Sequence, residues 1–235
     1  MSRPDRTLPV VPMPADHGSL LSYRVRRSDR ARRVRVTVDR GGVVEVVLPR
    51  RAPERAAEEA VRELRPWIDR RLAEVGRQQA AVLARGDTLP YLGQTLELQA
   101  EPGRTRVTRR ADRLYVPLGA QRTSAIERWY RQRARVEIQP RLERACERAG
   151  LSYTRLSIRD QRTRWGSCSR SGAVSFNWRL LLAPEAVLDY VIWHEVCHLA
   201  VLDHSPRFWA LVARYCPDHR QHAAWLRRNA GTLVL

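Results

Sequence analysis

The chain has 235 residues, of which 43% are hydrophobic, and a formal net charge of +18. This length can bury the core of one large or two small domains, and the apolar share is typical of a soluble globular protein. Four cysteines without Cys-x-x-Cys spacing exclude a disulfide framework and indicate reduced thiols. The sequence shows neither a secretory signal nor an apolar run long enough to span a bilayer, so we expect a cytoplasmic protein without membrane association.

The positive charge comes entirely from arginine and is spread along the chain. Residues 1–120 contain 24 arginines and 15 acidic residues, and residues 121–235 contain 19 arginines and 10 acidic residues. The positive electrostatic potential of such a chain favours association with polyanions, including nucleic acid. A basic surface that contacts only solvent would have the same composition.

The first half predicts a flexible leader followed by a small antiparallel strand-and-helix region. Residues 1–18 are proline-rich and aperiodic, so we expect a flexible leader there, with the strand-and-helix region over 19–120. Alternating and helical patterns in this region predict the following elements: strands 21–27, 31–38 and 43–48, a helix from 52 to 72 that kinks or breaks at Pro66, and a small antiparallel sheet from 88–92, 95–100, 104–109 and 114–116.

The second half predicts an α+β domain over residues 121–235. A long helix is expected over 124–149, closed by Gly150, and strands over 156–158 and 173–177. Between these strands, residues 159–168 are polar and contain glycine. An almost wholly apolar helix follows Pro184, and shorter helices are expected at 206–215 and 220–229.

The apolar helix carries the pattern His194-Glu195-x-x-His198. Residues four apart lie on one face of a helix, so both imidazoles can reach one ion, while Glu195 is offset by about 100° and can address the ion's open side. Burying three such groups without partners costs several kcal/mol, and a bound cation is the simplest partner. The pattern predicts one Zn²⁺ per chain and Glu195 as the catalytic residue; two core histidines beside a surface glutamate remain the alternative.

His204 is the expected third metal ligand. In an unbroken helix it would lie about 80° to one side of His194, at 100° per residue. Ser205-Pro206 predicts that the helix ends first, because proline disfavours the α conformation in the residue before it and suits the first position of a new helix. His204 would then lie at a corner and turn back toward the ion, although it is also an ordinary polar corner residue.

Four segments of the second half together resemble the YgjP-like family of zinc metallopeptidases, gluzincin-type relatives of the WLM and SprT or Spartan proteases. The segments are Arg162-Thr163-Arg164-Trp165-Gly166-Ser167-Cys168-Ser169, Asn177-Trp178-Arg179-Leu180, His194 to Leu199, and Asp203-His204-Ser205-Pro206-x-Phe208-Trp209. The resemblance implies a compact zincin-like metallohydrolase domain over 121–235, metal ligands at His194, His198 and His204, and Glu195 as the general base.

Three classes of function remain open from the sequence: a zinc peptidase acting on polypeptide, a metal-dependent hydrolase of nucleotides or phosphoesters, and a basic nucleic-acid-associated protein with structural zinc. A nucleophilic Cys168 is a further, weaker alternative.

The Arg-Trp-Gly-Ser-Cys segment is expected beside the metal. There Arg162, Arg164 and Trp165 are the candidate substrate-binding residues, with Arg162 or Arg164 holding a carboxylate or phosphate. In the alternative, Trp165 and Gly166 anchor a tight loop against the metal helix. For a peptide substrate, we expect backbone pairing with an exposed edge of strand 173–177, the nearest predicted strand before the metal helix. For a nucleotide, Arg159, Arg162 and Arg164 are the nearest phosphate ligands.

Overall fold

The computed structural model describes residues 11–13, 21–39, 41–161 and 163–235. The chain divides into two compact units, residues 1–81 and 82–235. Of the predicted leader, only Val11–Met13 is described, as strand β1; the rest lies outside the described residues. The helix α2 (Arg65–Leu83) runs across the boundary between the units.

The first unit is a mixed four-stranded sheet with two helices. Its strands β2 (Leu21–Ser28), β3 (Arg35–Val38) and β4 (Val44–Pro49) join β1 in the order β1-β2-β4-β3. The predicted hairpin of β3 and β4 is confirmed, with its turn held by Asp39 Oδ1, which accepts from the backbone N–H groups of Gly41 and Val43 at 2.8 Å. Helix α1 (Arg55–Glu63) ends at Leu64, so the break expected at Pro66 is confirmed and Pro66 lies in the first turn of α2.

The second unit begins with the sheet of β5 (Thr88–Tyr91), β6 (Gln94–Glu101), β7 (Thr108–Arg110) and β8 (Arg113–Pro117). The strand order is β5-β6-β8-β7, and β6 pairs with β8 in parallel, so the prediction of an antiparallel sheet is wrong at that pair. The strand predicted at 104–109 is reduced to 108–110.

This sheet belongs with the C-terminal helices, and the compact units therefore divide near residue 82 and not near residue 120 as the sequence analysis expected. Two hydrogen bonds join the segment to later elements: the N–H of Leu92 donates to Leu181 O at 2.8 Å, and the hydroxyl of Tyr130 donates to Pro90 O at 2.7 Å. Buried side chains from both segments also form one hydrophobic core.

A three-stranded sheet follows the 28-residue helix α3 (Arg122–Ala149), which ends where Gly150 takes a left-handed conformation at φ 65°. Its strands are β9 (Arg155–Arg159), β10 (Gly166–Cys168) and β11 (Ala173–Asn177), in the order β10-β11-β9. Strand β10 was expected only as part of a polar stretch. Because β11 is paired on both sides, the expectation that its edge receives a substrate is wrong, and β10 is the edge strand on this side.

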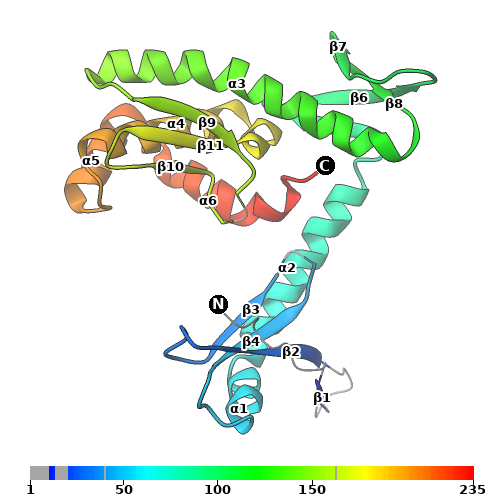
Figure 1. The fold of residues 1–235 in the computed structure, drawn as a ribbon, viewed down its shortest axis with the longest axis vertical. Coiled ribbons are helices and arrows are strands. Elements are labelled where there is room, and N and C mark those ends of the chain that lie inside the picture. The colour runs from blue at the N-terminus through cyan, green and yellow to red at the C-terminus, as the bar shows by residue number, and fades with distance from the viewer. Residues whose placement is uncertain (1–10, 14–20, 40, 162) are drawn as a thin grey trace, which may run out of the picture. The chain divides into compact units, whose positions relative to one another are not determined.

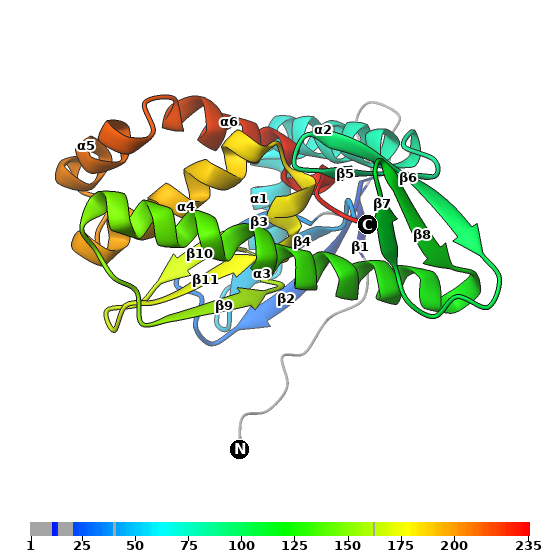
Figure 2. The same ribbon diagram turned by 90° about the horizontal axis from the view of Figure 1, so that it is seen from above.

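Three helices complete the second unit: α4 (Glu185–Ala200), α5 (Pro206–Tyr215) and α6 (His219–Asn229). Short 3-10 turns lie at Gly119–Gln121, Trp178–Leu182 and Ala230–Thr232. Helices α3 and α4 pack on the core side of the β9–β11 sheet, where Leu156, Val174 and Phe176 are buried (Figures 1 and 2). The fold is the mixed α and β class that was predicted. Within the described residues, no helix has the length and apolarity needed to cross a membrane.

Candidate metal centre

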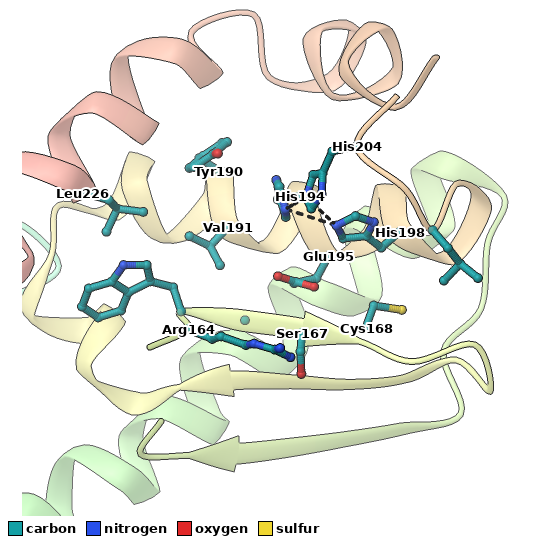
Figure 3. A pocket seen from close by; sticks show the side chains of 13 residues that line it. Arg164, Ser167, Cys168, Tyr190, Val191, His194, Glu195, His198, His204 and Leu226 are labelled. Atoms are coloured by element: carbon teal, nitrogen blue, oxygen red, sulfur yellow. Dashed lines mark hydrogen bonds between the residues drawn. The ribbon is translucent and has the colours of Figure 1, made fainter. Parts of the chain in front are cut away.

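Three histidines meet at one point on the surface of α4. The Nε2 atoms of His194, His198 and His204 lie 3.2 Å from one another, so they form an equilateral triangle (Figure 3). His198 is buried, His194 is partly buried and His204 is exposed. The sequence-predicted ligands are therefore brought together.

The chain turns sharply after α4, and this turn carries His204 back to the other two histidines. The helix ends at Ala200, and Val201 is extended. Asp203 Oδ1 accepts a hydrogen bond from the backbone N–H of Ser205 at 3.3 Å, and Pro206 opens α5. Ser205 itself makes no side-chain capping bond, so the corner depends on Asp203 and Pro206.

The contacts of His198 determine which of its ring nitrogens faces the other histidines as an acceptor. Its Nδ1 lies 3.0 Å from the carbonyl oxygen of Val201, which can only accept, so Nδ1 carries the proton. The neutral ring then presents a lone pair at Nε2. Burial lowers the pKa of His198, and burial together with the neighbouring histidines lowers the pKa of His194 to about 3, so both rings are neutral near pH 7.

Two aromatic side chains of α5 hold the imidazoles in place. Phe208 is fully buried and stacks on His198, with ring centroids 4.3 Å apart and an angle of 22° between the planes. Trp209 stacks on His204 at 5.7 Å and on His219 at 5.8 Å. Their place two and three residues after Pro206 could have indicated from the sequence that they contact His204.

This arrangement fits a zinc ion. Zinc binds imidazole nitrogen at about 2.0–2.1 Å, and a tetrahedral arrangement then separates two such nitrogens by about 3.3 Å, close to the observed 3.2 Å. Imidazole lone pairs that converge on one point repel one another unless a cation lies between them. Among the described residues, the histidines form a three-membered ligand group that includes neither Glu195 nor a cysteine. Three protein ligands and an open fourth position are typical of catalytic zinc.

Glu195 is buried beside the histidines without being one of the group. Its side chain is 4% exposed, and its Oε2 atom has no hydrogen-bond partner within the part of the chain that is described. Burial raises the pKa of its carboxyl to about 8, and the positive charge of Arg164 opposes that rise. A raised pKa means that this carboxyl group, once it has taken up a proton, holds it more strongly than an ordinary glutamate does, as a general base in a hydrolase must.

Gly166 of β10 leaves the space that Glu195 occupies. A Cβ atom at Gly166 would lie 2.5 Å from Glu195 Oε1 and 2.7 Å from Cγ, well inside van der Waals contact. Any side chain at this position would therefore displace the glutamate. This explains the glycine of the Arg-Trp-Gly-Ser-Cys segment by close approach, a role that sequence reasoning missed because it depends on contact between distant elements.

The loop before β10 is fastened by Asn177, which is 1% exposed. Its Nδ2 donates to Gln161 O at 2.7 Å and to Arg164 O at 3.3 Å, and its Oδ1 accepts from the backbone N–H of Arg179 at 3.1 Å. The N–H of Asn177 donates to Trp165 O at 2.8 Å. Hydrogen bonds from Asn177 to three backbone carbonyl oxygens therefore hold this loop in place.

A cavity of about 490 Å³ opens over Glu195 and the histidines (Figure 3). Arg164 and Trp165, two of the predicted substrate-binding residues, line it, and Arg162, the third, lies outside the described residues. Cys168 also lines the cavity, but burial and the charge of Glu195 raise the pKa of its thiol to about 11, which does not favour a nucleophilic thiolate. Arg159 does not line this cavity.

Residues 32–229 match the family model described as the YgjP-like metallopeptidase domain. No curated protein matches the chain. Among solved structures, the crystal structure of the metallopeptidase zymogen of Pyrococcus abyssi abylysin is 21% identical, with a TM-score of 0.36, over 39% of this chain and 93% of that chain. A likeness of that size carries no argument about this chain. Because the family model spans most of the 235 residues, the chain belongs to the YgjP-like metallopeptidase domain family.

Proposed function

We propose that this protein is a zinc-dependent peptidase in which His194, His198 and His204 hold one zinc ion and Glu195 is the general base. Membership of the metallopeptidase family supports a metal-dependent peptidase. The observation that carries the finer proposal is the triangle of Nε2 atoms, 3.2 Å on each side, next to a buried carboxylate that is not part of the ligand group.

Bound zinc supplies Lewis acidity to the oxygen atoms that occupy its open side. The protein supplies the proton transfer. The carboxyl group of Glu195, which lines the cavity, accepts a proton from the attacking water and delivers it to the nitrogen of the leaving amine, since one carboxyl group can act first as base and then as acid. Close contact with Gly166 restricts the carboxylate, so its position does not depend on substrate.

The outer edge of β10 is the proposed binding site for an extended polypeptide. Backbone bonds from Asn177 N to Trp165 O and from Ser169 N to Ala173 O identify the hydrogen-bonded pairs of the β10–β11 ladder. Because such pairs alternate along antiparallel strands, the peptide groups of Gly166 and Cys168 point away from β11. Both residues line the cavity, so a peptide paired with this edge would lie beside Glu195.

A hydrolase of nucleotides or phosphoesters is the second candidate, and Arg164 is the observation that favours it. Its guanidinium is exposed and makes no hydrogen bond or salt bridge with another described residue. It also lies close enough to Glu195 for its positive charge to lower the pKa of that carboxyl group, against the effect of burial. Such a group can bind phosphate. The third candidate, structural zinc, is less consistent with a group of three ligands, because structural sites almost always have four.

Glu195→Gln tests the peptidase proposal. The zinc-loaded variant is expected to keep its metal and its unfolding temperature but to lose at least about a hundredfold in the rate of cleavage of an unstructured polypeptide, the scale of general base catalysis. Glu147→Gln is the matched control, because Glu147 is exposed at the end of α3.

Nucleoside triphosphates are assayed at the same enzyme concentration. Their hydrolysis in place of polypeptide, with the same dependence on Glu195, would replace the peptidase by the second candidate. Loss of zinc from the glutamine variant would instead make Glu195 a ligand.

A further inference from the structure

The β9–β11 sheet carries a second cavity, of about 440 Å³, on the face that α3 and α4 do not cover. Ser167 belongs to this face: in Figure 3 its hydroxyl points away from Glu195 and the histidines. The cavity is lined by arginine and serine side chains from all three strands and from the loops next to β10. None of its lining residues is aspartate, glutamate or aromatic.

Three serines form a row across this face. Ser157 of β9 pairs with Ser175 of β11, and Ser175 pairs with Ser167 of β10. Residues in register point to the same face of a sheet, so the three hydroxyl groups lie side by side. The hydroxyls of Ser167 and Ser175 are 2.8 Å apart, and one hydrogen atom satisfies that contact. The other hydrogen remains available to a ligand.

Arginines surround the serine row. Arg155 and Arg159 lie two residues before and after Ser157 on β9, so the pleat directs them to the same face, and Arg164 reaches the cavity from the loop before β10. Their guanidinium groups form no hydrogen bond or salt bridge within the described ranges. Nearby, in contrast, Asp160 accepts hydrogen bonds from Arg179 and Arg131. The guanidinium donors of these three arginines are therefore not used by any partner in the described part of the chain.

We propose that this face binds a phosphate-bearing anion, with a short polyphosphate as the ligand that fits best. Guanidinium groups donate hydrogen bonds in pairs to phosphate oxygens, and serine hydroxyls donate singly, so the lining offers donors that match a multiply charged oxyanion. A solvated basic surface would explain the arginines, but it would not explain the row of three serine hydroxyls that line the same cavity. The lack of aromatic lining residues gives a nucleobase nothing on which to stack.

Calorimetric titration of the zinc-loaded protein with inorganic tripolyphosphate tests this site. Saturable binding of one anion per chain is expected. The double variant Arg155→Ala with Arg159→Ala should weaken it at least about tenfold, the scale of one charge-assisted hydrogen bond. The matched control is Arg128→Ala with Arg220→Ala, which removes the same charge from exposed positions on α3 and α6 and should leave the affinity within about twofold. Both double variants should retain the zinc content of the parent.

The proposal would be wrong if binding were not saturable, or if both double variants weakened it equally. It would also be wrong if binding were unchanged in the Arg155 and Arg159 variant but disappeared when zinc is chelated, because the anion would then bind the metal. A single-stranded oligonucleotide is titrated in parallel to identify the source of the phosphate. Tighter binding of the oligonucleotide with the same dependence on Arg155 and Arg159 would support the site and assign it to nucleic-acid backbones. Tighter binding of tripolyphosphate would assign it to free polyphosphate.

Discussion

The two faces of the β9–β11 sheet are built from the same strands but have opposite properties. On the face toward α4, Glu195 and His198 are 4% and 8% exposed, and ring stacking or close backbone contact holds each of them. On the other face, Arg155 and Arg159 are exposed, and their guanidinium groups make no hydrogen bond or salt bridge to another residue that the structure describes. The difference indicates that on the metal side even one added atom should disturb the packed side chains. On the arginine side, the charge of the residues should be more important than their exact positions.

Removing one of the proposed metal ligands should have the largest effect. In His204→Ala the remaining two histidines cannot form a three-ligand site, so we expect zinc to fall to less than about a tenth of one equivalent and cleavage to become undetectable. Metal analysis after dialysis measures this. His222→Ala, on α6, should keep full zinc. If His204→Ala also keeps full zinc, His204 is not a ligand.

Truncating one side chain on each face compares their contributions to stability. Phe176 is fully buried on the core face of β11, so Phe176→Ala should lower the free energy of unfolding by about 3–5 kcal/mol. Ser157, on the open face of β9, is half-buried, and its hydroxyl makes no hydrogen bond to another residue in the described part of the chain. Ser157→Ala should therefore change the free energy of unfolding by less than about 0.5 kcal/mol. Urea unfolding gives both values. Comparable losses would contradict the contrast between the two faces.

A single methyl group on β10 should damage catalysis without removing the metal. Gly166→Ala places its Cβ 2.5 Å from Glu195 Oε1, and the buried carboxylate must move to avoid it. A displacement of about 1 Å costs on the order of a hundredfold in rate, and zinc content should stay at one equivalent. Gly76→Ala is the control, because its added methyl meets no atom within 4 Å. Unchanged activity of Gly166→Ala would mean that the position of Glu195 is not important.

Arg164 lines both cavities, and Arg164→Ala should have the smallest effect on turnover, about tenfold, with zinc retained. The size of this loss in turnover should depend on whether the substrate carries a terminal phosphate. For a nucleoside triphosphate, the loss should shrink markedly when the terminal phosphate is absent, because the guanidinium then has no charged partner. An uncharged polypeptide has no phosphate for Arg164 to bind, so a loss of turnover on this substrate would have a different cause. Kinetics on both substrates distinguish the two proposed functions.

The sequence by itself determined the features that depend on local spacing. The i, i+4 separation of His194 and His198 places them on one helix face in any fold that keeps α4, and Pro206 predicts a new helix directly after the corner that holds His204. Alternating patterns likewise predicted most strands, and the predicted bounds of β11 match the observed ones. The bounds predicted for the helix α5 also match. Each of these follows from the geometry of a few consecutive residues.

Only the tertiary structure decided the features that depend on pairing between distant segments. It made β11 a central strand and β10 the edge, it paired β6 with β8 in parallel, and it joined the β5–β8 sheet to the C-terminal unit. It also brought Gly166 against Glu195 and aligned three serines among arginines. Strand order and register are set by contacts between residues far apart in the chain, and the spacing of residues within one segment does not encode them.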